Sequence, residues 1–290
     1  MHCQNGKLPA CKKANFSLQY VHMTIIQALF LGLIQGFTEF LPISSSGHLI
    51  FVPVVFGWLD QGTAFDVVVH LGSLLAVVWY FRARLKQMFL ACVDIKNPVL
   101  ATDRKLAWYI ILATLPALFA AFLFEQVLDI SFRSTLLVAV NLIVWGVVLA
   151  IADRYATKKP EKKAFADHTK KTAIYIGLAQ ALALLPGTSR SGITMTAGLF
   201  NNFSRKAAAE FSFLMSIPVI CIAGALALLQ IALGRVEVLS ASVLLAGFVS
   251  AAVSGYVAIN LLMKLIQKWS FLPFAVYRVL VGILILIFLV

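Results

Sequence analysis

The sequence predicts an all-α polytopic membrane protein with six transmembrane helices and two re-entrant helical hairpins, arranged as two inverted-topology repeats. Three observations predict this fold class. The 290-residue chain is 61% apolar and 12% charged, whereas a soluble domain carries roughly a quarter charged residues. Six apolar stretches are long enough to cross a bilayer, which takes about 20 residues. Two further apolar regions are interrupted by proline and small polar residues.

Residues 1–22 are polar, and we expect them to form a tail outside a single membrane domain at residues 23–290. The apolar run that follows holds Gln35 and Glu39, unlike the core of a cleavable signal peptide. Residues 24–59 predict the first hairpin, because Pro42 and the Ser-Ser-Ser-Gly sequence at 44–47 break the helix. Such irregular backbone within a membrane needs protein or a wet cavity around it.

Three spans complete the first repeat, which covers about residues 24–152. They are residues 65–81, 106–124 and 134–152. A basic loop at about 153–171 leads to the second repeat, about 173–290. Its hairpin, residues 173–203, is interrupted by Pro-Gly and then by Ser-Arg-Ser-Gly at 189–192. Its spans are residues 210–233, 238–263 and 272–290.

The distribution of lysine and arginine predicts the orientation. Four segments hold 17 of the 24 basic residues, namely 82–105, 153–171, 204–206 and 264–268. Cytoplasmic loops carry such an excess, and placing these segments in the cytoplasm makes the six spans alternate consistently. The first hairpin then opens outside and the second inside. Topology thus explains the net charge of +12, and we expect no nucleic-acid partner.

Short similarities support the repeat. Gly-Leu-x-Gln at 32–35 returns at 177–180, and Leu-Pro at 41–42 returns at 185–186. In membrane proteins with inverted repeats, the two broken elements meet near the midplane and form the binding site.

The first hairpin carries candidate catalytic residues. Gln35 and Glu39 lie on one helix face. Burying a carboxylate there costs about 2.5–3.5 kcal/mol, which indicates a metal ligand or a base, or else a wet vestibule around Glu39. Serine hydroxyls suit phosphate oxygens, and His48 could act as acid, base or nucleophile. The serines concerned are Ser44, Ser45 and Ser46.

The second hairpin carries a candidate oxyanion clamp. Arg190 lies between Ser189 and Ser191, with Thr194 one turn further along. The planar arginine fork matches phosphate, and a helix N-terminus adds positive potential. The alternative is an arginine that reaches to the membrane surface.

Other polar residues give weaker signals. Asp66 and His70 share one helix face, which indicates a polar lining or a supporting pair. Glu210 begins a span and suggests an interfacial position, and Arg278 beside Tyr277 suggests a membrane anchor.

Residues 35–48 and 186–194 resemble the two signatures of the undecaprenyl-pyrophosphate phosphatase family of the bacitracin-resistance type. The first resembles its (Glu/Gln)-x-x-x-Glu element with a serine-rich turn and histidine. The second is similar to Pro-Gly-x-Ser-Arg-Ser-x-x-Thr at every fixed position. Residues 209–214 and 274–278 are also similar to family stretches. Gln35 stands where many members have glutamate.

The resemblance implies an enzyme that hydrolyses undecaprenyl diphosphate to undecaprenyl phosphate and inorganic phosphate. This reaction recycles the lipid carrier for peptidoglycan and other cell-wall polymers and gives bacitracin resistance. The resemblance further implies Mg²⁺ or Ca²⁺, the bacterial cytoplasmic (inner) membrane, and a site that opens to the periplasm. A second copy of the chain is a candidate partner in a homodimer.

On this interpretation, Glu39 holds the cation and Arg190 stabilises the transferring phosphoryl group. Either Ser45 or His48 attacks the phosphorus or activates water. Substrate binding falls to Gln35, Ser44, Ser46, Ser189, Ser191 and Thr194. The alternative function is secondary transport or lipid flipping, since broken helices in inverted repeats are a transporter plan.

Overall fold

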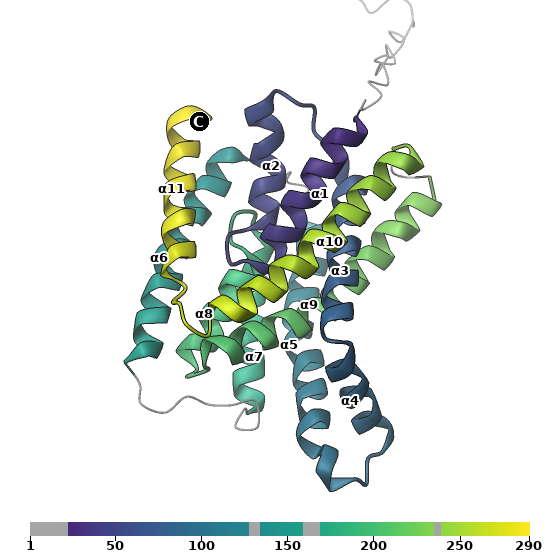
Figure 1. Ribbon diagram of the computed structural model, residues 1–290, viewed down its shortest axis with the longest axis vertical. Helices are drawn as coiled ribbons and strands as arrows, with labels where there is room; N and C mark the ends of the chain where they lie inside the picture. Colours follow the sequence, from purple (N-terminus) through teal and green to yellow (C-terminus); the bar gives the residue numbers. More distant parts are fainter. Residues whose placement is uncertain (1–22, 128–133, 159–168, 235–238) are drawn as a thin grey trace, which may run out of the picture.

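The computed structural model describes residues 23–127, 134–158, 169–234 and 239–290, and all regular structure within them is helical (Figure 1). The all-α prediction is therefore confirmed, while the predicted tail at 1–22 lies outside the described residues. In chain order the elements are α1 (Ile25–Phe40), α2 (Ser45–Phe56), α3 (Gly62–Tyr80), α4 (Arg82–Val93), η1 (Pro98–Leu100), α5 (Ala101–Val127), α6 (Thr135–Thr157), α7 (Lys170–Ala181), η3 (Leu182–Leu184), α8 (Arg190–Phe200), α9 (Arg205–Ala232), α10 (Ala241–Leu265) and α11 (Leu272–Phe288).

Five helices of the described chain are long and apolar enough to cross a membrane: α3, α5, α6, α9 and α10. They coincide with five of the six predicted spans and confirm a polytopic membrane protein. The sixth, α11, is apolar but has 17 residues, slightly less than a bilayer needs. Helix α6 runs past the predicted span end to Thr157, and Asp153 in this extension pairs with Arg205 at 2.6 Å.

Both predicted helix breaks are present and share one local structure. In the first, α1 ends at Phe40 and α2 begins at Ser45, with Ser44 at a φ of 76° between them. In the second, α8 begins directly after Ser189, which has a φ of 70°. Each of these serines caps its helix by accepting a hydrogen bond from the amide three residues ahead, at 3.3 Å and 3.1 Å. The same capping thus starts α2 and α8.

Two glycines place equivalent helices against equivalent neighbours. Gly32 on α1 faces the carbonyl of Gly247 on α10, and Gly177 on α7 faces the carbonyl of Ala113 on α5. A methyl group at either glycine would collide with that backbone. In the two-repeat architecture, α1 corresponds to α7 and α5 corresponds to α10. The contact of α1 with α10 is therefore equivalent to the contact of α7 with α5.

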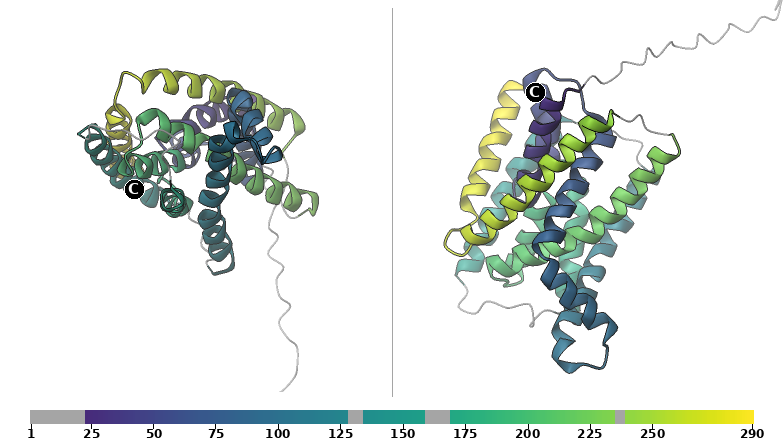
Figure 2. Two further views of the ribbon diagram at one scale, coloured as in Figure 1. Left: turned by 90° about the horizontal axis from the view of Figure 1, so that it is seen from below. Right: turned by 45° about the vertical axis from the view of Figure 1, so that its right-hand side comes forward.

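The helix ends gather at two opposite poles. Helix α4 and the start of α5 project at the lower end of Figure 1, and the end of α6 and the start of α7 lie toward the same end. The start of α1 and the end of α11 lie at the upper end, and the right-hand view of Figure 2 shows the same arrangement. The broken pairs α1–α2 and α7–α8 meet between the poles.

Candidate active site

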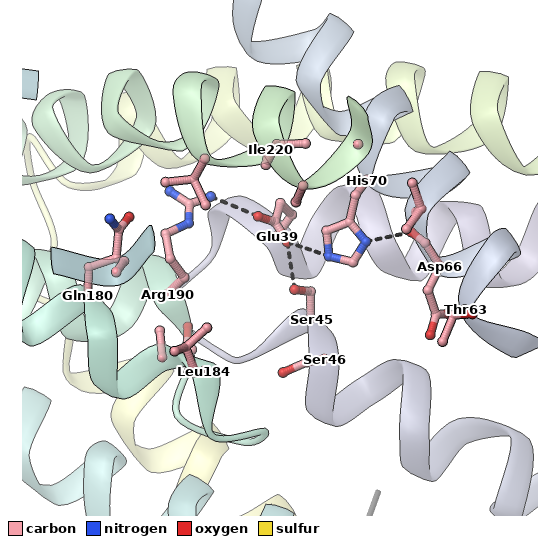
Figure 3. Close-up of a pocket in the computed structure, with 17 residues that line it drawn as sticks. Glu39, Ser45, Ser46, Thr63, Asp66, His70, Gln180, Leu184, Arg190 and Ile220 are labelled. Carbon is pink, nitrogen blue, oxygen red and sulfur yellow. Dashed lines mark hydrogen bonds and ion pairs between the residues drawn. The ribbon is translucent and has the colours of Figure 1, made fainter. Parts of the chain in front are cut away.

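A cavity of about 370 Å³ lies where the two broken pairs meet. Its walls come from both halves of the chain, including α1, α2, α3, α8 and α9, and Figure 3 shows the side chains that line it. Apolar residues of α5, η3 and α9 make up much of the wall. The polar lining residues are Glu39, Ser45, Ser46, Thr63, Asp66, His70, Gln180, Ser189 and Arg190.

The carboxylate of Glu39 is the centre of the polar network. Arg190 Nη2 lies 2.8 Å from Glu39 Oε1, although the two residues are far apart in the chain. Ser45 Oγ donates to Glu39 Oε2 at 2.6 Å, and Gln35 Nε2 donates to the same oxygen at 3.1 Å. Only 6% of the Glu39 side chain is exposed, so these donors replace the water that burial removes.

Arg190 is the first residue of α8, and its two side-chain contacts do not use all of its N–H donors. Nη1 donates to the carbonyl of Ser212 at 2.8 Å, and Nη2 bonds Glu39. A guanidinium carries five N–H donors, so N–H groups remain that these two contacts do not use. The side chain is 13% exposed and lines the cavity. The structure therefore disfavours the alternative in which Arg190 reaches to the membrane surface.

Ser45 has the environment of an activated nucleophile. It is the first residue of α2, and its hydroxyl lies in the cavity wall with its proton directed to Glu39. Serine needs an adjacent base within about 2.6–3.2 Å to attack, and Glu39 is at that distance. Glu39 could thus serve as a base as well as a cation ligand.

His48 lies behind the cavity wall and does not line it. Its Nδ1 is 2.7 Å from the carbonyl of Ser44, which can only accept, so Nδ1 carries hydrogen. Its Nε2 lies 2.8 Å from the hydroxyl of Tyr277 and accepts from it in the neutral ring. Both nitrogens therefore have structural partners, and this arrangement favours Ser45 over His48 as the nucleophile.

The predicted substrate-binding residues divide into two groups. Ser46 and Ser189 line the cavity, whereas the other four do not. Ser44 caps α2, and Gln35 holds Glu39. Ser191 Oγ donates to the carbonyl of Leu41 at 3.0 Å, and Thr194 Oγ1 lies 2.7 Å from Ser212 Oγ. Ser191 and Thr194 thus connect the second break to the first break and to α9, because these short side chains point between helices.

His70 belongs to the Glu39 network, which the sequence did not indicate. Its Nε2 lies 3.6 Å from Glu39 Oε2, and its Nδ1 lies 2.6 Å from the carbonyl of Asp66 (Figure 3). The four-residue spacing predicted a polar lining or a supporting pair for Asp66 and His70, and both residues do line the cavity. The approach of His70 to Glu39 depends on the packing of α1 against α3, which no local spacing encodes.

Arg278 corrects the expectation of a membrane anchor. Its side chain is fully buried and donates to carbonyls of both breaks, with distances of 3.4 Å to Pro42 and 2.8 Å to Thr188. Further donations reach α6 and Gly187. Broken helices leave carbonyls without helical partners, and an arginine with five donors satisfies several at once. Arg278 therefore holds the two breaks against each other.

Comparison with known proteins identifies the family of this chain. A family model described as bacitracin resistance protein BacA matches residues 28–284. The chain belongs to this family. A relative from Alteromonas mediterranea named undecaprenyl-diphosphatase is 48% identical over 267 residues, covering 92% of this chain and 99% of the relative. Relatives from Pseudoalteromonas translucida (undecaprenyl-diphosphatase 1) and Aliivibrio salmonicida (undecaprenyl-diphosphatase) are 45% and 44% identical, covering 92% and 90% of this chain and 99% and 96% of theirs.

The cation expected from the resemblance to the BacA family can be tested against the donor set. Within the described residues, no group of three His, Cys, Asp or Glu side chains is arranged to hold a metal ion, so a cage made by protein alone does not fit. Two carboxylates, Glu39 and Asp66, line the cavity. Mg²⁺ is usually held by one or two carboxylates together with substrate phosphates. The residues therefore fit a cation that is shared with a phosphate ligand.

Proposed function

We propose that this protein hydrolyses undecaprenyl diphosphate to undecaprenyl phosphate and inorganic phosphate. The reaction recycles the lipid carrier for peptidoglycan and other cell-wall polymers and gives resistance to bacitracin. One observation carries the proposal: the Ser45 hydroxyl bonds Glu39, which is paired with Arg190 in a cavity with apolar walls. A nucleophile (Ser45), a base (Glu39) and a guanidinium group that can bind phosphate (Arg190) thus meet in a cavity whose apolar walls suit a lipid diphosphate.

The chemistry runs in two displacements. Ser45 Oγ attacks the terminal phosphorus while its proton passes to Glu39, and the bond from that phosphorus to the bridging oxygen breaks. Undecaprenyl phosphate leaves, and Ser45 carries the phosphoryl group. Water then attacks this phosphorus, the bond to Ser45 Oγ breaks, Glu39 returns its proton to the serine oxygen, and inorganic phosphate departs with the protons of the water. Arg190 stabilises the charge on the transferring phosphoryl oxygens in both steps.

Mg²⁺ or Ca²⁺ would be held by Glu39 together with the diphosphate oxygens and would neutralise phosphate charge. Gln35 can lend only a neutral oxygen to such a site, and its Oε1 is buried without a partner among the described residues.

The test is phosphate release from undecaprenyl diphosphate by the purified protein in detergent. We expect release that stops when a chelator such as EDTA is added and returns when Mg²⁺ or Ca²⁺ is restored. The second candidate, a transporter or flippase, is favoured by the paired helix breaks. It predicts movement of lipid across vesicle bilayers and no phosphate. Absence of release with either cation would contradict the hydrolase.

The protein would lie in the bacterial cytoplasmic (inner) membrane with the cavity open to the periplasm. Helix α4, the start of α5 and the loop between them, which carry the six basic residues of segment 82–105, project at one pole of the fold and support this orientation. Assembly into a homodimer stays a prediction.

Single cysteines test the orientation. In a background without the four native cysteines, Leu59→Cys at the α2–α3 turn and Lys96→Cys after α4 place thiols at exposed positions of opposite poles. A membrane-impermeant maleimide added to intact spheroplasts should label position 59, whereas position 96 should react only after permeabilisation. The reverse labelling pattern would overturn the proposed orientation.

A further inference from the structure

Gln180 is a buried amide of the cavity wall to which the chemistry above gives no role. It lies in the last turn of α7 and is 2% exposed. Figure 3 shows it on the far side of Arg190 from Glu39. Its Nε2 donates to the carbonyl of Ala113 at 3.4 Å, whereas its Oε1 has no hydrogen-bond partner among the described residues. The wall thus contains an unused acceptor.

The orientation of this amide follows from its neighbour. The Ala113 carbonyl can only accept a hydrogen bond, so the NH₂ group belongs on that side. Turning the amide over would bring two acceptors together and would leave the NH₂ group without this partner. The oxygen is therefore the atom left without a partner among the described residues, and a buried acceptor is stable when a ligand brings it a donor.

The chemistry of the cavity narrows the choice of donor. Ionised diphosphate oxygens are acceptors themselves and do not suit an amide oxygen. Water is a donor, and a hydrolase must admit one water molecule in each cycle. When Ser45 carries the phosphoryl group, Glu39 holds the serine proton and is still bonded by Arg190 and Gln35, so another acceptor would be needed to orient that water.

The internal repeat gives an independent reason to assign Gln180 a role in the site. Gln180 follows Gln35 by 145 positions and occupies the equivalent place on the equivalent helix, α7 instead of α1. Gln35 turns its NH₂ group to Glu39, so one amide orients the carboxylate. The other amide, from the second repeat, presents an oxygen instead.

We propose that Gln180 Oε1 accepts a hydrogen bond from the water that attacks the phosphoryl group on Ser45. This inference rests on the proposed function. In this step the water oxygen bonds to phosphorus and the bond from phosphorus to Ser45 Oγ breaks. Glu39 returns to Ser45 Oγ the proton that it took in the first displacement, and inorganic phosphate leaves with the protons of the water. Glutamine side chains orient attacking water in the same way in other phosphoryl-transfer enzymes.

The test uses Gln180→Met, which keeps the length of the side chain and removes the acceptor. Lipid monophosphate and inorganic phosphate are followed separately in a single turnover of undecaprenyl diphosphate. We expect lipid monophosphate to form at a rate within threefold of the unaltered protein. Inorganic phosphate should appear at least tenfold more slowly, while phosphate accumulates on the protein. Gln180→Glu keeps an acceptor and should release phosphate faster than Gln180→Met.

Gln61→Met is the comparison for a lost buried amide, because Gln61 also has an unpaired Oε1 but does not line the cavity; its Nε2 holds Asp66 at 2.7 Å, so any slowing should affect both products alike. It should release both products together at the normal ratio. Unchanged phosphate release in Gln180→Met would overturn the proposal. Equal slowing of both products, or a raised KM with normal kcat, would also overturn it by placing Gln180 in lipid binding. If the unaltered protein releases no phosphate, the proposed function fails instead.

Discussion

Replacing Ser45 by alanine should lower kcat for phosphate release by roughly a thousandfold or more, the scale of loss seen when a nucleophile is removed. The reason is geometric. Ser45 Oγ is the hydroxyl that donates to the buried Glu39 carboxylate, at 2.6 Å, and it lies in the cavity wall. Alanine retains the start of α2, because the capping side chain belongs to Ser44. The measurement is steady-state phosphate release by the purified variant, with folding checked by thermal unfolding.

Two comparisons make this result specific. Ser46→Ala alters the neighbouring hydroxyl in the same wall and should act mainly on KM. His48→Ala removes the contacts to Ser44 and Tyr277, so it should loosen the turn while leaving measurable turnover. A histidine nucleophile reverses the ranking of Ser45→Ala and His48→Ala. An acid-labile phosphoenzyme trapped in Ser45→Ala would show that histidine carries the phosphoryl group.

The sequence allowed the helix breaks and the importance of Glu39 and Arg190 to be predicted, because the signals for both are local. A proline followed by serines and glycine ends a helix wherever it stands, and both breaks appear where those residues lie. A carboxylate at position 39 and an arginine at position 190 are too costly to leave alone in an apolar segment. Their direct pairing was not predicted, because it depends on the packing of α1 against α8, and the structure reveals it.

Other parts of the site depend on packing between distant helices and could not be predicted from spacing. Arg278 lies near the start of an apolar helix, where an anchor is the ordinary interpretation, but α11 packs beside both breaks and buries it. Ser191 and Thr194 belong to the same motif as Arg190, yet successive residues of a helix point in different directions. One motif therefore supplies both a cavity residue and contacts that hold the breaks together.

Replacing Arg190 by lysine should lower kcat/KM by roughly a hundredfold, about 3 kcal/mol, the size of one lost oxyanion donor. Arg190 must bond Glu39 and the Ser212 carbonyl at the same time and still present N–H groups to the phosphoryl oxygens. Lysine supplies a point charge without the planar fork. The measurement is kcat and KM on undecaprenyl diphosphate. Near-normal turnover in Arg190→Lys would mean that charge alone suffices.

Arg205→Lys controls for the general effect of this exchange in a buried pair, because Arg205 bonds both carboxylate oxygens of Asp153 at 2.6 and 3.0 Å and does not line the cavity. It should lower stability and leave kcat within about threefold, since no phosphoryl contact is lost. Arg190→Ala leaves Glu39 buried without its partner, a change that typically costs 3–5 kcal/mol. The double variant Arg190→Ala/Glu39→Gln removes both charges and should regain much of that stability while staying inactive. Stability that returns without activity would separate the role of Arg190 in phosphoryl transfer from its role in holding Glu39.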